Sequence, residues 1–141
     1  MMKTYLGIVA LVLAGVCGCG SAGGEAATCE PAGTWSVTAS PAAGNDCADG
    51  EMVATDTRVV TVANGTATIT DTSTGAMHAA PLDGSCHMAY VTAVSTSDFV
   101  AAGSTDWTFN GTSLSGAVNA NVTATDGTKC TLKQTLTGVR Q

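Results

Sequence analysis

The chain has 141 residues, with 5 Lys and Arg against 11 Asp and Glu, and its formal net charge is −6 at pH 7. This excess of acid, without any cluster of basic residues, argues against nucleic acid or anionic lipid head groups as electrostatic partners. Aromatic residues make up only 4% of the chain, so a single domain of this size would have a modest core built largely from Ala and Val.

Residues 1–18 have the features of a bacterial lipoprotein signal peptide. Lys3 supplies a short positive region, and an uncharged apolar run over 6–16 follows it. Such a run is too short to span a bilayer but has the length of a signal-peptide core. Small residues beside a cysteine end the run, as a lipoprotein-processing peptidase requires. Cys19 fits this pattern better than Cys17, which follows a branched valine, so we expect lipidation at Cys19.

Lipidation at Cys19 predicts a protein anchored to a membrane of the bacterial cell envelope. Gly20 follows the cysteine in place of an acid, and this favours the outer membrane by analogy with enteric sorting. The alternative is an ordinary secretory signal cut near Ala22. Residues 19–28 are small and polar without periodicity, so we expect a flexible tether there.

Residues 29–141 predict a succession of short strands with little helix. Each run of alternating apolar and polar residues ends at a turn signal, and Asn64-Gly65 is the clearest two-residue hairpin turn. Short turns leave no room for helical crossovers, so the strands would form an antiparallel meander. The expected strands, about eight in number, cover 35–39, 58–62, 66–70, 76–80, 86–94, a segment around 107–109, 114–124 and 130–140.

A meander of this length leaves two exposed edges unless it closes on itself. Closure removes both edges, so we expect an all-β, antiparallel up-and-down barrel. A β-sandwich is the alternative, because alternation in the sequence does not separate the two architectures.

Gly33-Thr34-Trp35 stands at the start of the first expected strand, and Arg140 stands at the end of the last. This pattern resembles that of the lipocalins and the wider calycin group, in which a G-x-W on the first strand packs against a basic residue of the last. The resemblance implies a closed barrel, since only closure makes these strands neighbours. It also implies a cation–π contact between Arg140 and Trp35 that closes one end.

Cys29, Cys47, Cys86 and Cys130 remain after the signal, an even number that suits two disulfides in an exported protein. In the expected barrel, Cys29 and Cys86 lie at the end where the chain enters. Cys47 and Cys130 lie at the other end. Since a disulfide needs close Cα atoms, only Cys29–Cys86 with Cys47–Cys130 keeps each bridge at one end.

A hairpin centred on Leu82-Asp83 would place His78 opposite His87, and Met77 opposite Met88. Two imidazoles at this distance could share a metal ion, but structural zinc takes four ligands and catalytic zinc three. No third ligand is evident, so we expect an exposed histidine pair and neither a metal nor a cofactor.

The chain lacks a G-x-S-x-G elbow, a phosphate loop and a His-Glu-x-x-His motif, so we do not expect an enzyme. A barrel of eight strands can hold one small ligand or be filled by its own side chains. The first case predicts a binding protein for a small apolar ligand, and the second a structural envelope protein. The expected inward residues are Ile69, Met88, Tyr90, Val118 and Leu132.

Overall fold

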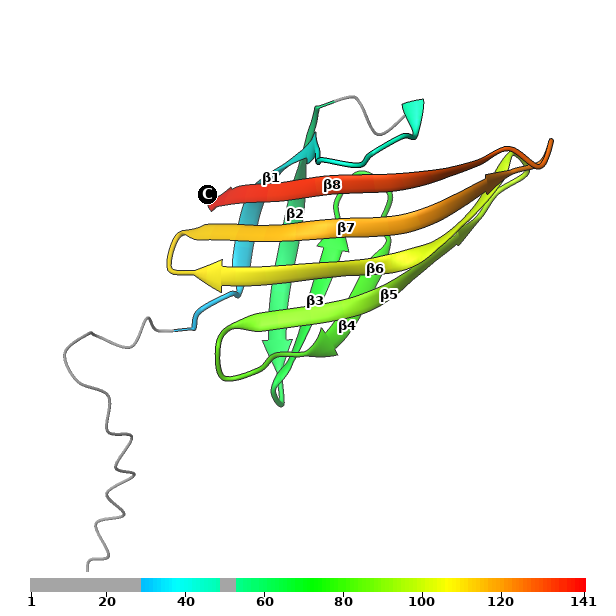
Figure 1. Cartoon of the computed structure of the whole chain (residues 1–141). Helices are drawn as coiled ribbons and strands as arrows, with labels where there is room; N and C mark the ends of the chain where they lie inside the picture. The colour runs from blue at the N-terminus through cyan, green and yellow to red at the C-terminus, as the bar shows by residue number, and fades with distance from the viewer. Residues whose placement is uncertain (1–28, 49–52) are drawn as a thin grey trace, which may run out of the picture.

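The computed structural model describes residues 29–48 and 53–141, which form eight antiparallel strands in up-and-down order (Figure 1). This confirms the predicted all-β meander, which forms a nearly closed barrel. Within the described residues, no helix has the length and apolar character needed to cross a membrane. The strands are β1 (Gly33–Pro41), β2 (Ala54–Ala63), β3 (Thr66–Asp71), β4 (Met77–Pro81), β5 (His87–Ser95), β6 (Phe99–Asn110), β7 (Ser113–Ala124) and β8 (Lys129–Arg140).

The first and last strands are neighbours in the sheet, whose order is β4-β3-β2-β1-β8-β7-β6-β5. Strand β1 pairs with β8 from Trp35 opposite Arg140 to Pro41 opposite Gln134. Strands β4 and β5 are the two edges of the sheet, since β4 pairs with β3 and β5 pairs with β6. The gap between these two edges is here called the seam. In Figure 1, strands β5–β8 cross in front of β1–β4 at a steep angle. The barrel is therefore built from two crossing halves joined through β1 and β8.

The seam has a local cause in the corner between β4 and β5. The Asp83 carboxylate accepts hydrogen bonds from the Ser85 hydroxyl, the Ser85 N–H and the His87 N–H. Cys86 takes a left-handed conformation with φ 62°. Because this corner is longer than a two-residue hairpin turn, it redirects β5 away from β4.

Glycines within the long strands β6 and β7 allow the half of the barrel formed by β5–β8 to curve. A Cβ atom at Gly103 would collide with the Asn119 carbonyl oxygen, and one at Gly116 would collide with that of Asp106. Both positions face the interior. Backbones can approach this closely only where the side chain is absent, which is how glycines bend strands in barrels.

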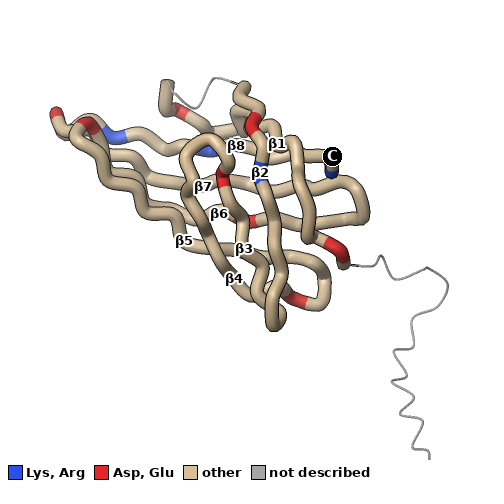
Figure 2. The backbone as a smooth tube through the Cα atoms, turned by 180° about the vertical axis from the view of Figure 1, so that it is seen from behind, with Lys and Arg blue, Asp and Glu red and all other residues tan. Residues whose placement is uncertain are grey.

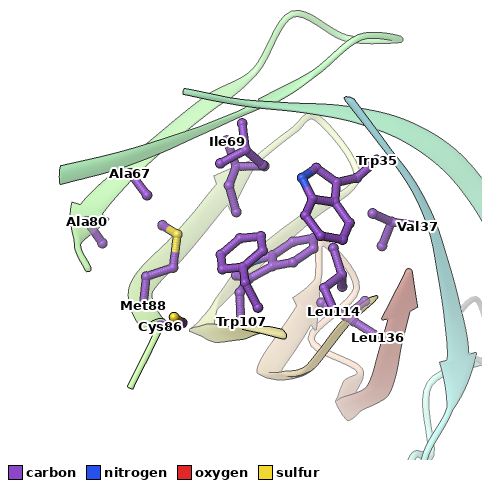
Figure 3. Packing of buried hydrophobic residues seen from close by; sticks show 12 residues of the cluster. Trp35, Val37, Ala67, Ile69, Ala80, Cys86, Met88, Trp107, Leu114 and Leu136 are labelled. Atoms are coloured by element: carbon purple, nitrogen blue, oxygen red, sulfur yellow. The ribbon is translucent and has the colours of Figure 1, made fainter. Parts of the chain in front are cut away.

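The core fills the end of the barrel at which the chain enters, here called the closed end. Trp35, Ile69 and Met88 are almost wholly buried there, and the Trp35 and Phe109 rings lie 5.5 Å apart. Figure 3 shows side chains from both halves pointing into this shared interior. The buried cluster consists of Trp35, Val37, Val60, Ala67, Ile69, Ala80, Cys86, Met88, Trp107, Phe109, Leu114 and Leu136.

Candidate functional site

The structure brings Gly33, Trp35 and Arg140 together at the closed end. The Arg140 guanidinium carbon lies 5.1 Å from the centroid of the Trp35 ring. The Trp35 Nε1–H donates a hydrogen bond of 2.8 Å to the Pro31 carbonyl. Gly33 lies against Arg140 with φ 142°, a backbone conformation that favours glycine, and a Cβ there would be in van der Waals contact with Arg140 Nε at 3.5 Å. The three residues thus form a plug at this end.

Both predicted disulfides are present, one at each end of the barrel. Cys29 and Cys86 join at the closed end with Cα atoms 5.4 Å apart. Cys47 and Cys130 join at the opposite end, called the open end, with Cα atoms 5.1 Å apart. The strand directions that led to this pairing are therefore confirmed.

The open end contains a hollow of about 320 Å³. Its single polar residue is Thr92, whose hydroxyl hydrogen-bonds with that of Thr105 at 3.1 Å. The volume falls in the range of small-molecule sites. The hollow is lined by Cys47, Ala48, Thr92, Val94, Phe99, Ala101, Val118, Ala120, Val122, Cys130 and Leu132.

Two features of the sequence leave this space unfilled. Strands β6, β7 and β8 have 12 residues each, whereas β3 and β4 have 6 and 5. The long strands therefore extend past β1–β4, as Figure 1 shows. The inward residues on this extension are mainly Ala and Val, with a single aromatic residue, Phe99, whereas Trp35, Trp107 and Phe109 gather at the closed end. Short side chains on an uncovered concave face leave Val94 41% exposed although it faces inward.

A smaller recess of about 120 Å³ lies in the interior and has a polar wall. Its residues include Asp56, Arg58, Tyr90 and Gln134. Tyr90 precedes Thr92 of the hollow as the next inward residue on β5. Gln134 likewise neighbours Val118 of the hollow across the β7–β8 pair. The residues that line the hollow and the recess are thus neighbours on the same strands, with the recess toward the closed end.

Arg58 is held by two carboxylates. Its Nε and Nη2 donate to Asp56 at 2.8 and 2.6 Å, and its Nη1 lies 3.0 Å from Asp71 Oδ2. Burial lowers the pKa of Arg58, but the hydrogen bond and charge of Asp56 and the charge of Asp71 outweigh this effect and raise it. Hydrogen bonding from the Ser73 hydroxyl lowers the pKa of Asp71, against the opposing effect of burial. Arg58 and Asp71 are therefore charged at neutral pH. With two acidic side chains against one basic side chain, the cluster has a formal charge of −1.

Tyr90 stays a neutral hydroxyl in this recess, because burial raises its pKa above the ordinary value. Its oxygen lies 3.3 Å from Trp107 Nε1, which donates to it. Its ring stacks on that of His78 with centroids 4.5 Å apart and an angle of 5° between planes. Since His78 belongs to β4 and Tyr90 to β5, this stack is a side-chain contact between the two strands that border the seam.

The predicted pairing of His78 with His87 is wrong. His78 faces the interior against Tyr90, while the Nδ1 of His87 lies 3.5 Å from Asp83 Oδ2. The expected match of Met77 with Met88 fails for the same reason: the first is 68% exposed and the second 1%. The corner at 82–86 replaces the symmetric two-residue turn on which both pairings depended.

The one grouping of metal-ligand residue types in the described part of the chain is Asp46 with Cys47 and Cys130. Its two sulfur atoms form the open-end disulfide, so they are not available as thiolate ligands.

The five residues predicted to face inward occupy three different parts of the interior. Ile69 and Met88 belong to the filled closed end. Val118 and Leu132 line the hollow, and Tyr90 lines the recess. The Asp56–Arg58–Asp71 cluster was not anticipated. The available signal was alternation, since Arg58 and Asp56 share the inward register of Val60 on β2.

The predicted signal peptide 1–18, the lipidation site Cys19 and the tether 19–28 lie outside the described residues. No protein-family model, curated protein or solved structure matches the chain. The resemblance to lipocalins and calycins consequently rests on Gly33, Trp35 and Arg140 and on the barrel that they close.

Proposed function

We propose that this protein is a non-catalytic binding protein that holds one small apolar ligand in the hollow at the open end. The observation that carries the proposal is an apolar hollow of about 320 Å³ at the end opposite the buried cluster. Transfer of apolar surface from water into such a space is favourable by about 25 cal/mol per Å². The packed end and the open-end disulfide hold the walls in place, so little ordering would accompany binding.

We further propose that a lipid on Cys19 anchors the protein to the cell envelope, with the outer membrane as the destination. Cys29 lies at the closed end, bridged to Cys86, and the hollow lies at the opposite end. A tether that joins the chain before Cys29 would therefore direct the hollow away from the membrane. Ligand would enter from the aqueous side.

Ala120→Leu tests the binding site directly. Ala120 is buried to 7% exposure and lines the hollow, so a larger side chain there would occupy ligand space. We expect binding of the neutral fluorescent probe N-phenyl-1-naphthylamine to weaken by about tenfold or more, as loss of a few buried methylene contacts implies. Ala117→Leu, on the outward face of the same strand, is the matched control and should leave binding unchanged.

Failure of the wild-type protein to bind the probe would contradict the proposal. That result would favour the alternative of a structural envelope protein with a filled barrel. Equal loss of binding in both leucine variants would also count against the hollow, because it would indicate a general effect on the fold.

Cys19→Ala tests the anchor. We expect the variant to leave the membrane fraction or to accumulate with its signal peptide uncut, because the thiol that carries the lipid is missing. Cys17→Ala is the control and should be processed normally. Fractionation followed by intact-mass measurement gives both readouts. Membrane retention of Cys19→Ala at unchanged mass would contradict lipidation at this residue.

A further inference from the structure

Acidic side chains outnumber basic ones around the recess and the hollow. Arg58 and Asp56 line the recess, and Asp71 pairs with Arg58. Toward the solvent, the hollow continues into a groove of about 500 Å³ lined in part by Asp46, Asp98 and Lys129. Each of these two groups has one net negative charge. Figure 2 shows how few charged residues lie elsewhere along the strands.

The one basic residue of the recess is already occupied. Asp56 binds the Nε and Nη2 edge of Arg58 in a bidentate pair, and Asp71 takes Nη1. A ligand carboxylate would have to displace one of these carboxylates or stay unpaired beside them. An unpaired carboxylate in an apolar space is strongly disfavoured.

A ligand group that donates hydrogen bonds and has no negative charge would find partners in the recess. The Asp56 side chain is 34% exposed and can accept further hydrogen bonds on its oxygens. The Gln134 amide and the Tyr90 hydroxyl line the same recess and offer both donors and acceptors. A hydroxyl or ammonium group placed there would be paired on several sides, and an ammonium would also gain from the net negative charge.

We infer that the ligand is an amphiphile whose apolar chain fills the hollow and whose polar end, an alcohol or amine and not a carboxylate, lies in the recess beside Asp56. This inference rests on the proposed function, because it names the class of ligand for the same hollow. It goes further in excluding free fatty acids, whose chain would fit but whose head group would face like charges.

Three probes of equal chain length test the inference: 1-dodecanol, dodecylamine and dodecanoate. Each is titrated, below its micelle concentration and at neutral pH and low salt, against wild-type protein carrying N-phenyl-1-naphthylamine. We expect dodecylamine and dodecanol to displace the naphthylamine at concentrations about tenfold or more below that needed for dodecanoate. A unit charge acting across several ångströms of a partly dry cavity has an effect of this order.

Asp56→Asn identifies the residue responsible. The substitution removes the net charge of the recess, so we expect the preference for dodecylamine over dodecanoate to shrink by about tenfold. Asp106→Asn is the matched control, since it removes the same charge on the outward face of β6. It should leave the preference unchanged. Thermal unfolding of both variants checks that each is folded.

The outcomes separate the inference from the proposed function. If the naphthylamine does not bind, the proposed function fails. If it binds and dodecanoate displaces it as well as dodecylamine does, the inference is overturned while the hollow remains a binding site. An unchanged preference in folded Asp56→Asn would likewise overturn the role of the recess. The comparison of the three probes on wild-type protein stands even if that variant does not fold.

Discussion

Replacing both Cys47 and Cys130 with alanine is expected to lower the free energy of unfolding by about 4 kcal/mol. The two residues are 83 positions apart in sequence, so their bridge closes a long loop in the unfolded chain. Loss of this constraint increases the entropy of the unfolded state. The bridge also fastens the segment after β1 to β8, where Ala42 N–H donates to the Lys133 carbonyl and Asp46 N–H to that of Thr131.

Urea unfolding of the oxidised proteins measures this effect. Non-reducing peptide mapping of the variant serves as the control and should find Cys29 still joined to Cys86. A loss below about 1 kcal/mol, the level of an ordinary point substitution, would contradict a constraining role for the bridge. Because Cys47 and Cys130 also line the hollow, the variant should bind the naphthylamine less tightly.

Trp35→Ala is expected to lower the free energy of unfolding by about 4 kcal/mol, the usual result of truncating a large core aromatic. The indole is 0% exposed, packs 5.5 Å from the Phe109 ring and donates to the Pro31 carbonyl. It also covers the Arg140 guanidinium, whose Nη1 lies 4.0 Å from Glu30 Oε2 and whose Nε and Nη2 are buried without hydrogen-bond partners among the described residues. Removing the ring leaves a cavity and deprives this partly buried charge of its aromatic contact.

Val139→Ala is a suitable control for that measurement. Val139 lies next to Arg140 on β8 but is 59% exposed, so its truncation should change stability by no more than about 0.5 kcal/mol. Chemical denaturation of the two variants side by side gives the comparison. Similar small losses in both would show that the closed-end plug contributes little to stability.

The sequence was sufficient for the strands and their order because the relevant signals are local. Alternation and the Asn64-Gly65 turn, with φ values of 52° and 74°, define β2 and β3. Closure follows from placing Trp35 and Arg140 on neighbouring strands, and the disulfide pairing follows from strand direction. Each of these conclusions depends on a period, a turn or a chain direction, and none requires the shape of the interior.

The features that could not be predicted depend on shape or on one side-chain network. The corner after β4 follows from the three hydrogen bonds accepted by Asp83 and from the left-handed backbone of Cys86. The assumption of a two-residue turn at Leu82-Asp83 therefore paired His78 with the wrong residue. The hollow depends on how far β6–β8 extend past β3 and β4, and strand ends are the least certain part of any sequence pattern.

Methyl-resolved NMR with 1-dodecanol tests the central claim, that the open end binds an apolar ligand, most directly. Titration should shift the methyl signals of Val94, Val122 and Leu132, which line the hollow. The methyls of Ile69 and Leu114 should not shift, because both side chains are buried in the cluster of the closed end and line neither the hollow nor the recess. Shifts confined to exposed Val91 and Val139, or no shifts at all, would contradict binding in the hollow.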